Sequence, residues 1–432
     1  MDDRPLKVLS VCTSDDGGGA ARAAYRIHQG VLEMGVDSRM FVKYKLGKGT
    51  DVVSLDEFVP HNSLYRAFDW IRNKLKNKIQ HFYWNRYPER ENLFMSDLRG
   101  TALHGALRKL DYDILHLHWI NRRFISPKDL PKDKPIVWTL HDSWPFCGIC
   151  HYFLECEGYK EQCGCCPFLH SDKTKDLSHR VWKRKAEMYD DLDLHIVTPS
   201  HWLGECAKQS SLLNRFPVTV IPNCLDVNVF KLLDKNDISL KWRTFQEKSF
   251  AKHFVLFGAM NAASDEIKGF KKLLSALRVL EKQGRCDDFE LLVFGATESG
   301  LSMDVGIPVH YVGYVNDTQE LVSLYNLASV MVVPSLTEVF GQTASEAMAC
   351  GTPVVAFRCT GIQEVVDHKL NGYLAEPYDS EDLAAGILWC LENNNGNRLG
   401  EAAREKVMES YTSERVCQRY KELYEYLHKR QR

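Results

Sequence analysis

Short apolar runs alternate with amphipathic stretches along the first half of the chain. Residues 7–13 (KVLSVCT) form a run rich in β-branched residues that ends in an acidic, glycine-rich turn. Residues 20–34 then carry apolar side chains at helical spacing and stop at Gly35. Further strand-like runs follow at residues 114–118, 136–140, 195–199 and 219–222. Short buried strands that alternate with helices predict a parallel, doubly wound sheet.

A second series of the same kind begins at Phe254. Its strand-like runs lie at residues 254–259, 291–296, 309–312, 330–333 and 353–357. The chain has 432 residues, 44% of them hydrophobic, which is enough for two cores. We therefore predict an α/β protein with two Rossmann-like domains. Residues 1–222 form the first, residues 223–411 the second, and residues 412–432 a final segment whose helix spans 412–427.

Two carboxylates stand just beyond the predicted strand at residues 330–333. Glu338 and Glu346 have seven residues between them, and a helix is expected to begin near Gln342. The residues that this helix turns inward are Ala344, Ala347 and Met348. A helix start offers unpaired N–H groups to a phosphate, so two flanking carboxylates suit a ligand with a diphosphate between two sugars, which is a nucleotide sugar. Two isolated glutamates would instead belong to a solvated loop and a helix surface.

Two further loops could approach such a ligand. The glycines 17–19 allow the backbone to come close to it, although any tight turn could use them and they do not form the dinucleotide fingerprint. Lys268 precedes Gly269 in a loop that runs into a helix, where it could neutralise a diphosphate. Its alternative is a solvated loop lysine, as expected for Lys271 and Lys272.

Histidines lie at the ends of two predicted strands. His141 and Asp142 follow the run IVWTL, and ligands of such sheets bind beyond the carboxyl ends of the strands. This place makes His141 a site candidate, with a structural histidine as the alternative. His116 and His118 alternate with apolar residues, and we expect one to face the site and the other to be structural.

Six of the 14 cysteines fall between residues 147 and 166. In a reducing compartment such clustering favours metal binding over disulfides. Four thiolates suit a structural zinc ion and leave no open position for chemistry. The predicted ligands are Cys150, Cys156, Cys163 and Cys166, with Cys147, Cys165 and His151 as alternates. Free cysteines in a disordered loop remain the other interpretation.

Residues 64–84 combine apolar side chains at helical spacing with basic residues. The apolar positions are Leu64, Phe68, Ile71, Leu75, Ile79 and Phe82, and the basic and tryptophan positions are Arg66, Arg72, Lys74, Lys76, Lys78, Trp70 and Trp84. A basic amphipathic helix with aromatic residues can lie on an anionic membrane surface. A core-packing helix with a solvated basic face fits the pattern equally well.

The net charge and the hydropathy of the chain limit the kinds of partner that we expect. The formal net charge of −2 carries no signal for nucleic acid, so no nucleic-acid partner is expected. No apolar run reaches the roughly 18–20 residues of a membrane helix, and the N-terminus reads as a charged lead into a strand rather than a signal peptide. We expect a cytoplasmic protein, peripheral at the inner face of the membrane if residues 64–84 bind lipid.

The motifs of the second half occur in the order of a known family. Between residues 254 and 391 they are FGA…KGF, LLVFGA, VGYVND, LYNLASVMVVPS, the glutamate run, ACGTPVVAF, GIQEVV and NGYLAEP, and the first half adds DGGGAARAAYRI, TLHDSWPF, TPSHWL and IPNCLD. Through them the chain resembles the retaining glycosyltransferases of family 4. That resemblance implies the GT-B fold, in which two Rossmann-like domains face a cleft and the last helix returns to the first domain. The cysteine-rich insert resembles a bacterial subset that builds capsule, exopolysaccharide or O-antigen.

The resemblance also implies roles for single residues. Glu338 resembles the glutamate near the donor sugar, Lys268 the diphosphate-binding lysine and His141 the histidine near the donor sugar. The implied donor-binding residues are Gly18, Gly19, Asn261, Phe340, Gly341, Gln342, Thr343 and Glu346. The family usually places an arginine after the first strand of the second domain, where this chain reads Gly-Ala-Met-Asn at 258–261. Asn261 or an arginine of the first domain is expected to substitute for it.

The implied reaction moves a sugar, with retention, from a nucleotide-diphosphate sugar to a glycan or polyprenyl-linked acceptor, in surface polysaccharide biosynthesis. The leaving phosphate would take the acceptor's proton, so no catalytic metal is expected. Two alternatives remain at this point. One is a nucleotide-sugar epimerase or phosphorylase of the same fold, and the other is a non-catalytic sugar- or zinc-binding adaptor.

Overall fold

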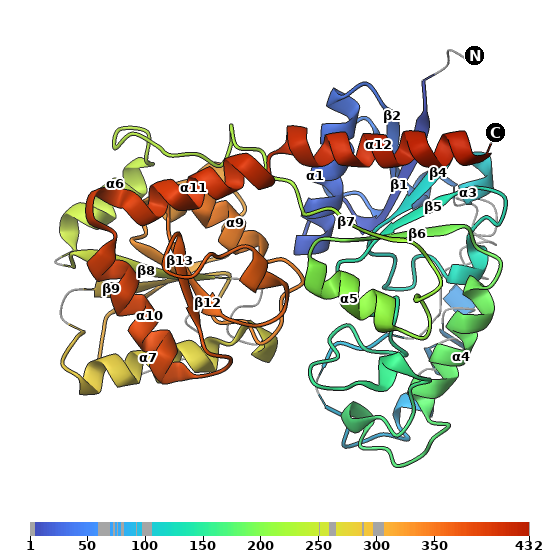
Figure 1. The fold of residues 1–432 in the computed structure, drawn as a ribbon, viewed down its shortest axis with the longest axis horizontal. Helices are drawn as coiled ribbons and strands as arrows, with labels where there is room; N and C mark the ends of the chain where they lie inside the picture. The colour runs from blue at the N-terminus through green and yellow to red at the C-terminus, as the bar shows by residue number, and fades with distance from the viewer. Residues whose placement is uncertain are drawn as a thin grey trace. The chain divides into compact units, whose positions relative to one another are not determined.

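The chain divides into two compact units (Figure 1). The computed structural model describes residues 5–58, 70–71, 74–75, 77–78, 82–91, 93–96, 106–249, 251–258, 265–286, 289–296 and 306–431. Unit 1 comprises Met1–Thr198, Gly204–Ile221 and Gln418–Arg432, and unit 2 comprises Pro199–Leu203 and Pro222–Cys417. The residues that follow Gln418 in the last helix thus belong with the N-terminal part of the chain.

Unit 1 contains a seven-stranded parallel sheet in the order β3-β2-β1-β4-β5-β6-β7. Its strands are β1 (Lys7–Ser14), β2 (Asp37–Tyr44), β3 (Val52–Ser54), β4 (Ile114–Leu117), β5 (Ile136–Thr139), β6 (Leu194–Thr198) and β7 (Val218–Val220). Its helices are α1 (Gly19–Glu33), α3 (Ala106–Lys109), α4 (Leu177–Tyr189), α5 (His201–Gln209), whose first residues fall in unit 2, and most of α12 (Ser413–Gln431). Short 3₁₀ turns lie at Leu55–Phe58, Pro127–Asp129, Gly158–Lys160 and Pro167–Leu169.

Unit 2 contains a six-stranded parallel sheet in the order β10-β9-β8-β11-β12-β13. Its strands are β8 (His253–Gly258), β9 (Phe289–Phe294), β10 (Val309–Gly313), β11 (Val330–Val333), β12 (Val354–Phe357) and β13 (Gly372–Ala375). Its helices are α6 (Leu240–Lys248), α7 (Phe270–Lys282), α8 (Thr318–Leu327), α9 (Gln342–Ala349), α10 (Ser380–Asn393) and α11 (Arg398–Ser410). Its 3₁₀ turns are η5 (Glu266–Lys268), Thr360–Glu364 and Asn395–Asn397.

Both faces of the unit 2 sheet are covered, which explains its uninterrupted apolar strands. Side chains that alternate along β8, such as Leu256 and Phe257, enter two separate cores. One core includes α8, α9 and α11, and the other includes α7 and α10. Because a strand's side chains alternate between faces, a strand covered on both sides must be apolar at every position.

The sequence pattern predicted most strands to within two residues. It missed β2, β3 and β13. β2 reads DSRMFVKY, with polar residues at both ends, and β3 and β13 are only three and four residues long. These strands lie at or next to sheet edges, where partial exposure removes the continuous apolar signal.

In each sheet the strand order reverses once. The reversal falls between β1 and β4 in unit 1 and between β8 and β11 in unit 2. In open α/β sheets, ligands bind beyond the carboxyl ends of the strands at such a reversal. The loops that follow these four strands therefore contain the positions to inspect for function. Among the described residues, no helix is long and apolar enough to cross a membrane.

Candidate active site

An ion pair occupies the strand reversal of unit 2. The Lys268 Nζ lies 2.6 Å from the Glu338 Oε1, and about a fifth of each side chain is exposed. Lys268 ends the turn after β8, and Glu338 lies in the loop after β11. The Ser335 hydroxyl also donates to the same carboxylate, at 3.1 Å. The structure thus brings together two residues that are 70 positions apart and that the sequence singled out separately.

Close backbone contacts fix the two loops that hold this pair. The Leu336 N–H donates to the Ile267 carbonyl at 2.8 Å. Gly269 adopts φ +71°, and a Cβ there would come within 1.8 Å of the Pro334 carbonyl oxygen. Only glycine allows both that conformation and that approach. The Lys–Gly order noted in the sequence therefore has a steric reason, because Gly269 brings Lys268 against the Glu338 loop.

The Glu338 backbone is held from its other side as well. Its N–H donates to the Thr360 Oγ1 at 3.0 Å, and its carbonyl accepts from the Gly361 N–H at 2.8 Å. A Cβ on Gly361 would lie 2.2 Å from the Val339 carbonyl oxygen. Glu338 is therefore a loop residue with a well-determined backbone, and its carboxylate is aimed by neighbours on two segments.

α9 begins where the sequence predicted, at Gln342, and its cap is Gly341 with φ +97°. Phe340 is buried and packs edge-on against Tyr411, with ring centroids 5.1 Å apart. Gln342 and Thr343 are partly exposed in the first turn. The predicted inward residues Ala344, Ala347 and Met348 are fully buried. α9 thus begins directly after the loop that contains Glu338, so its first N–H groups belong to residues that closely follow Glu338 in the sequence.

Glu346, by contrast, is buried, with 3% of its surface exposed. The Tyr325 hydroxyl donates to its Oε2 at 3.0 Å, and the Tyr325 carbonyl accepts from Thr352 at 2.6 Å. The sequence analysis did not identify Tyr325, which occurs among apolar residues of α8. The sequence offers only a general indication of this contact, because a buried tyrosine hydroxyl normally has a polar partner.

The glycine loop of unit 1 leads into α1. Gly17 has φ +91°, Gly18 caps the helix and Gly19 is its first residue. A Cβ on Gly18 or Gly19 would have no neighbour within 4 Å. Packing within the described residues therefore does not require glycine at these two positions, and the space beside this backbone is open.

A cluster of three histidines lies at the carboxyl ends of β4 and β5, with His116 in β4 itself and His118 and His141 just beyond the two strands. The His118 Nδ1 is 3.0 Å from the His141 Nε2, and the rings of His116 and His118 have centroids 4.0 Å apart. Burial lowers the pKa of His116 to about 3 and of His141 to about 4, and it also lowers the pKa of His118 well below its usual value. All three rings are therefore neutral near pH 7. His118, for which the sequence left the role open, is the direct partner of the predicted site residue His141.

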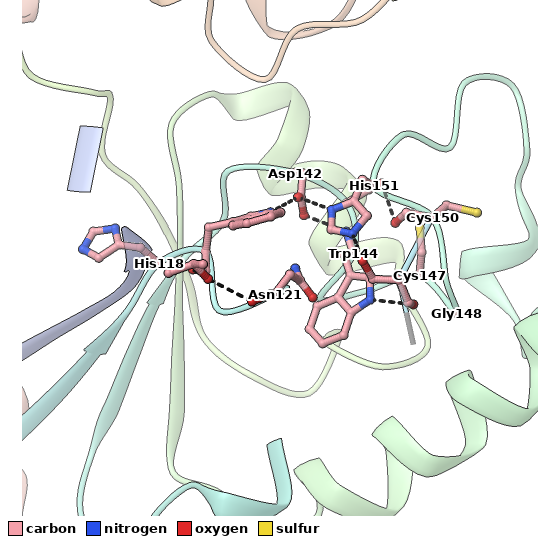
Figure 2. A network of polar contacts seen from close by, with 12 residues as sticks. His118, Asn121, Asp142, Trp144, Cys147, Gly148, Cys150 and His151 are labelled. Carbon is pink, nitrogen blue, oxygen red and sulfur yellow. Dashed lines mark hydrogen bonds and ion pairs between the residues drawn. The ribbon is translucent and has the colours of Figure 1, made fainter. Parts of the chain in front are cut away.

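Asp142 anchors the loop that carries His141 (Figure 2). Its carboxylate lies 2.5 Å from the His151 Nδ1 and accepts from the Trp119 Nε1 at 2.7 Å and the Trp144 N–H at 2.9 Å. Burial raises the pKa of Asp142, but His151 and these donors outweigh it, so the net pKa is lowered. A neighbouring buried lysine, Lys185, donates to the carbonyls of Trp144, Cys147 and Gly148, and burial lowers its pKa to about 7.

The cysteine insert is folded throughout its length. The Cys150 and Cys166 thiols share a hydrogen bond that raises the pKa of Cys150 and lowers that of Cys166. Cys163 and Cys165 both have positive φ, on either side of Gly164. None of the 14 cysteines, all of which lie within the described residues, forms a disulfide. Within the described residues, no three His, Cys, Asp or Glu side chains converge as a metal site.

His151 does not act as an alternate metal ligand in this arrangement. Its Nδ1 faces Asp142 and its Nε2 lies 2.9 Å from the Ser96 hydroxyl, so both ring nitrogens are engaged. Two other predictions cannot be compared with the structure. Asn261 lies outside the described residues, and residues 64–84 are described only at 70–71, 74–75, 77–78 and 82–84.

Two family models match the chain. Residues 17–229 match the description "Glycosyltransferase Family 4", and residues 241–406 match "Glycosyl transferases group 1". The two matches follow the two sheets, because the first covers most of unit 1 and the second most of unit 2.

Relatives of the chain include proteins named as glycosyltransferases. An uncharacterized glycosyltransferase of Methanocaldococcus jannaschii, MJ1607, is 30% identical over 68% of this chain and 70% of its own. The putative colanic acid biosynthesis glycosyl transferase WcaC of Escherichia coli is 25% identical over 81% and 82%. N-acetyl-α-D-glucosaminyl L-malate synthase of Bacillus anthracis is 27% identical over 48% of this chain, and the match spans only 53% of that relative.

Solved structures share the fold at low sequence identity. Sucrose-phosphate synthase of Thermosynechococcus elongatus superposes with a TM-score of 0.63 at 18% identity, covering 98% of this chain and 99% of its own. Anabaena HepE in complex with UDP-glucose gives 0.62 at 16% identity, covering 97% and 99%. Two Rossmann-like sheets, the two family models and these relatives agree. The chain therefore belongs to glycosyltransferase family 4 and is a glycosyltransferase of the GT-B fold.

Proposed function

We propose that the protein moves a hexose from a nucleotide-diphosphate sugar to a glycan or polyprenyl-linked acceptor, with retention, in surface polysaccharide biosynthesis. The observation that carries the donor assignment is the Lys268–Glu338 pair at the strand reversal of unit 2, directly before the start of α9. The names of WcaC and of the HepE complex support a polysaccharide pathway and a nucleotide-sugar donor.

The ion pair suits a site that must accept an anion. In the structure the Lys268 ammonium is neutralised by Glu338 at 2.6 Å. A diphosphate would compete for that ammonium, and the N–H groups at the start of α9 would bind its oxygens. Glu338 would then be released from Lys268 and could accept hydrogen bonds from the donor sugar. Donor binding thus exchanges the Lys268–Glu338 pair for a Lys268–diphosphate pair, and the Glu338 carboxylate then accepts hydrogen bonds from hydroxyls in place of the ammonium.

Glu346 is proposed to bind the nucleotide ribose. It is buried and held by Tyr325, which suits a carboxylate that must keep one orientation. A fixed acceptor can bind two neighbouring hydroxyls without paying to order itself first. Glu346 should therefore act mainly on affinity and Glu338 mainly on turnover.

The proposed chemistry follows from where charge develops. Cleavage of the sugar–phosphate bond builds negative charge on the diphosphate, where Lys268 and the helix start would stabilise it. The acceptor hydroxyl would attack from the same face and give its proton to the leaving phosphate. This route needs neither a covalent intermediate nor a catalytic metal. Lys268 then has an essential electrostatic role, because the family's usual arginine is replaced in the segment 258–261.

A donor screen tests this function. Purified protein is mixed with UDP- and GDP-sugars, and its melting temperature and nucleotide release are measured. One nucleotide sugar should stabilise the fold and be slowly hydrolysed, since a ligand that binds only the native state adds about 2.7 kcal/mol at 100 times its Kd. Failure of every nucleotide sugar to bind would refute the proposal. Epimerisation of the sugar without nucleotide release, or binding without any turnover, would replace it with the epimerase or the adaptor.

We further propose that the insert holds one structural zinc ion through Cys150, Cys156, Cys163 and Cys166. Four thiols in one folded segment provide the donor type that zinc prefers. The positive φ of Cys163 and Cys165 indicates the kind of tight turn that can direct thiols to one point. The donors fit in chemistry but are not preassembled, so ligation requires their side chains to rotate.

Metal analysis of protein purified without added zinc tests this proposal. About one zinc per chain is expected from four thiolate ligands, with a Cys150→Ser, Cys166→Ser variant losing the metal. A matched variant at Cys390, a buried cysteine of α10 far along the chain from the insert, should keep it. Wild-type protein without stoichiometric zinc would contradict the proposal.

We also propose that the segment 64–84 contacts an anionic membrane surface at the cytoplasmic face. Four of its described apolar residues, Trp70, Ile71, Leu75 and Phe82, are each between 58% and 62% exposed, and Tyr83 and Trp84 are partly exposed. The Lys74 ammonium lies 4.7 Å from the centre of the Trp70 ring. Exposed aromatic and basic residues together favour an interfacial location.

Vesicle sedimentation tests this contact. The protein should sediment with vesicles that contain phosphatidylglycerol and not with pure phosphatidylcholine. A Trp70→Ser, Leu75→Ser variant should lose binding, whereas Leu240→Ser, at an exposed leucine of unit 2, should not. Equal binding of all three proteins would show that the segment is not the contact.

A further inference from the structure

Two histidines from neighbouring strands form one hydrogen-bonded pair in unit 1. His118 follows β4 and His141 follows β5, and the His118 Nδ1 lies 3.0 Å from the His141 Nε2. His118 is buried, with 2% of its surface exposed, and His141 is partly exposed. The rings are stacked, with an interplanar angle of 26°. The buried ring is thus placed to control the exposed one.

Only one of the two facing nitrogens can carry the proton of this hydrogen bond. Burial lowers the pKa of both rings, so each is neutral and has one N–H and one bare nitrogen. If His141 donated from Nε2, the His118 proton would be on its Nε2. If His118 donated from Nδ1, its Nε2 would be bare.

The surroundings of His118 favour the second arrangement. Its Nε2 is buried and has no hydrogen-bond partner among the described residues. A buried N–H without a partner is rarer in native proteins than an unsatisfied acceptor. The His118 proton is therefore assigned to Nδ1, where it bonds to His141, and the lone pair of its Nε2 is left without a partner.

We infer that His118 is a positioning residue that holds His141 in the tautomer with its proton on Nδ1. His141 then presents a neutral N–H to a substrate hydroxyl or ring oxygen and does not act as a base. The inference rests on the proposed sugar-transfer function for its consequence in turnover. Its structural content, the position of one proton, does not depend on that function.

The layer behind the pair supports this assignment. The His116 Nε2 lies 2.8 Å from the Thr139 hydroxyl, and its Nδ1 lies 2.7 Å from the Tyr424 hydroxyl of α12. The Tyr420 hydroxyl is 3.0 Å from the same threonine oxygen. Hydroxyl groups satisfy both nitrogens of His116. His116 therefore offers no proton and no acceptor to His118, and it does not compete with His141 for the His118 Nδ1.

The charged and titratable groups around the pair are few in the described part of the chain. His116 and His28 act on His118, and both are rings whose own pKa is lowered by burial. Asp142 acts on His141, but its carboxylate is engaged by His151, Trp119 and Trp144 (Figure 2). Burial outweighs the effect of Asp142, and both rings stay neutral near pH 7.

Ring-nitrogen NMR of the full chain labelled with ¹⁵N-histidine tests the inference without requiring activity. The His141 and His118 signals are assigned by their loss in His141→Gln and His118→Asn. His141 should show a protonated Nδ1 and a bare Nε2. A His141 ring protonated at Nε2 would overturn the inference, whatever the enzyme's activity.

Two substitutions at position 118 then separate positioning from packing. Asn places an amide N–H close to the place of Nδ1, and Leu fills the space without a donor. We expect His118→Asn to keep the His141 tautomer and turnover within a few-fold of wild type. In His118→Leu, His141 should no longer be held with its proton on Nδ1. We expect kcat to fall by about 10²-fold, as when other hydrogen bonds to the transition state are lost, with KM for the nucleotide sugar unchanged.

The outcomes are distinguishable from a failure of the proposed function. Equal kcat and equal His141 spectra in the Asn and Leu variants would show that His118 only fills space. An enzyme inactive with every nucleotide sugar would refute the proposed function, while the wild-type spectrum would still decide the tautomer. If the Leu variant fails to fold, the wild-type spectrum and the Asn variant decide the inference.

Discussion

The two units share one strand order, to which unit 1 adds a seventh strand, yet the polar groups at their strand ends differ in charge. Unit 2 keeps full charges there, in the Lys268–Glu338 pair, and unit 1 keeps neutral rings, in the cluster of His116, His118 and His141. The ion pair is partly exposed, whereas His116 and His118 are buried. In unit 2, solvent and an oppositely charged partner favour the charged forms. In unit 1, desolvation favours the neutral form of the histidine rings.

This difference indicates a division of work. A lysine ammonium can neutralise the charge of a bound diphosphate, whereas a neutral imidazole ring cannot. A neutral N–H can bind a sugar oxygen at constant strength over a wide pH range, which a titrating cation cannot. Each substitution or change of pH below alters the polar groups of one unit and leaves those of the other unit unchanged.

The largest effect is expected for Glu338→Ala. Loss of the carboxylate removes a proposed contact to the donor sugar, and kcat should fall by about 10³-fold. The melting temperature should stay close to that of the wild type, because the backbone of the loop is held by Thr360 and Gly361 rather than by the carboxylate. Steady-state transfer assays and calorimetry measure both. The control is Glu266→Ala, an exposed carboxylate on the neighbouring turn. Retained turnover in Glu338→Ala would remove this residue from the site.

A somewhat smaller loss is expected for Lys268→Met. The variant keeps the length of the side chain but not the charge that would stabilise the leaving diphosphate, so kcat/KM should fall by about 10²-fold. Lys271→Met is the matched control, since Lys271 is exposed and forms an ion pair with the exposed Glu266. Similar kinetics for the two methionine variants would mean that Lys268 is one more solvated lysine.

Acidification should destabilise unit 1 before unit 2. The folded pKa of the clustered histidines is depressed, so the unfolded chain binds more protons below its pKa of about 6.5. Their contribution to stability is therefore complete above pH 6.5 and is lost as pH falls toward the folded values of about 4 for His141 and about 3 for His116. Each histidine contributes up to about 1.4 kcal/mol per pH unit in that window.

Hydrogen exchange followed by mass spectrometry distinguishes the two units in this experiment. Peptides from β4 and β5 should lose protection between pH 6.5 and pH 4, while peptides from β8 and β11 keep theirs. Simultaneous loss of protection in both units would show that the histidine cluster does not control the acid limit.

The smallest effect is expected for Tyr325→Phe. The change removes one hydrogen bond to the buried Glu346 and leaves the ring packing intact. A hydrogen bond to a charged group contributes about 1.5–3 kcal/mol, part of which the carboxylate can regain elsewhere. KM for the donor should rise about tenfold by that reasoning, with kcat nearly unchanged. A fall in kcat at constant KM would move Glu346 from binding to turnover.

Much of the fold could be predicted because buried parallel strands leave a strong local signal. β11 and the start of α9 fall where the apolar run and the glycine place them. The edge strand β3 and its neighbour β2 were missed because partly exposed strands lack a continuous apolar run in the sequence. The site residues at strand ends were predictable one by one, since strand ends can be recognised from the same runs.

The partners of those residues could not be predicted. Tyr325 and Glu346 lie on different helices, and Tyr424 meets His116 across 308 residues of sequence. No local pattern encodes such a pair, because the distance between two side chains depends on how all the intervening elements pack.

The sequence by itself therefore determined the two sheets, the membership in family 4 and the chemical identity of the site residues. Only the tertiary structure decided their state. Packing placed Lys268 against Glu338 as an ion pair, and it buried His118 beside His141, where burial lowers the pKa of both rings. The physical reason is that protonation depends on solvation and on neighbours, and folding determines both.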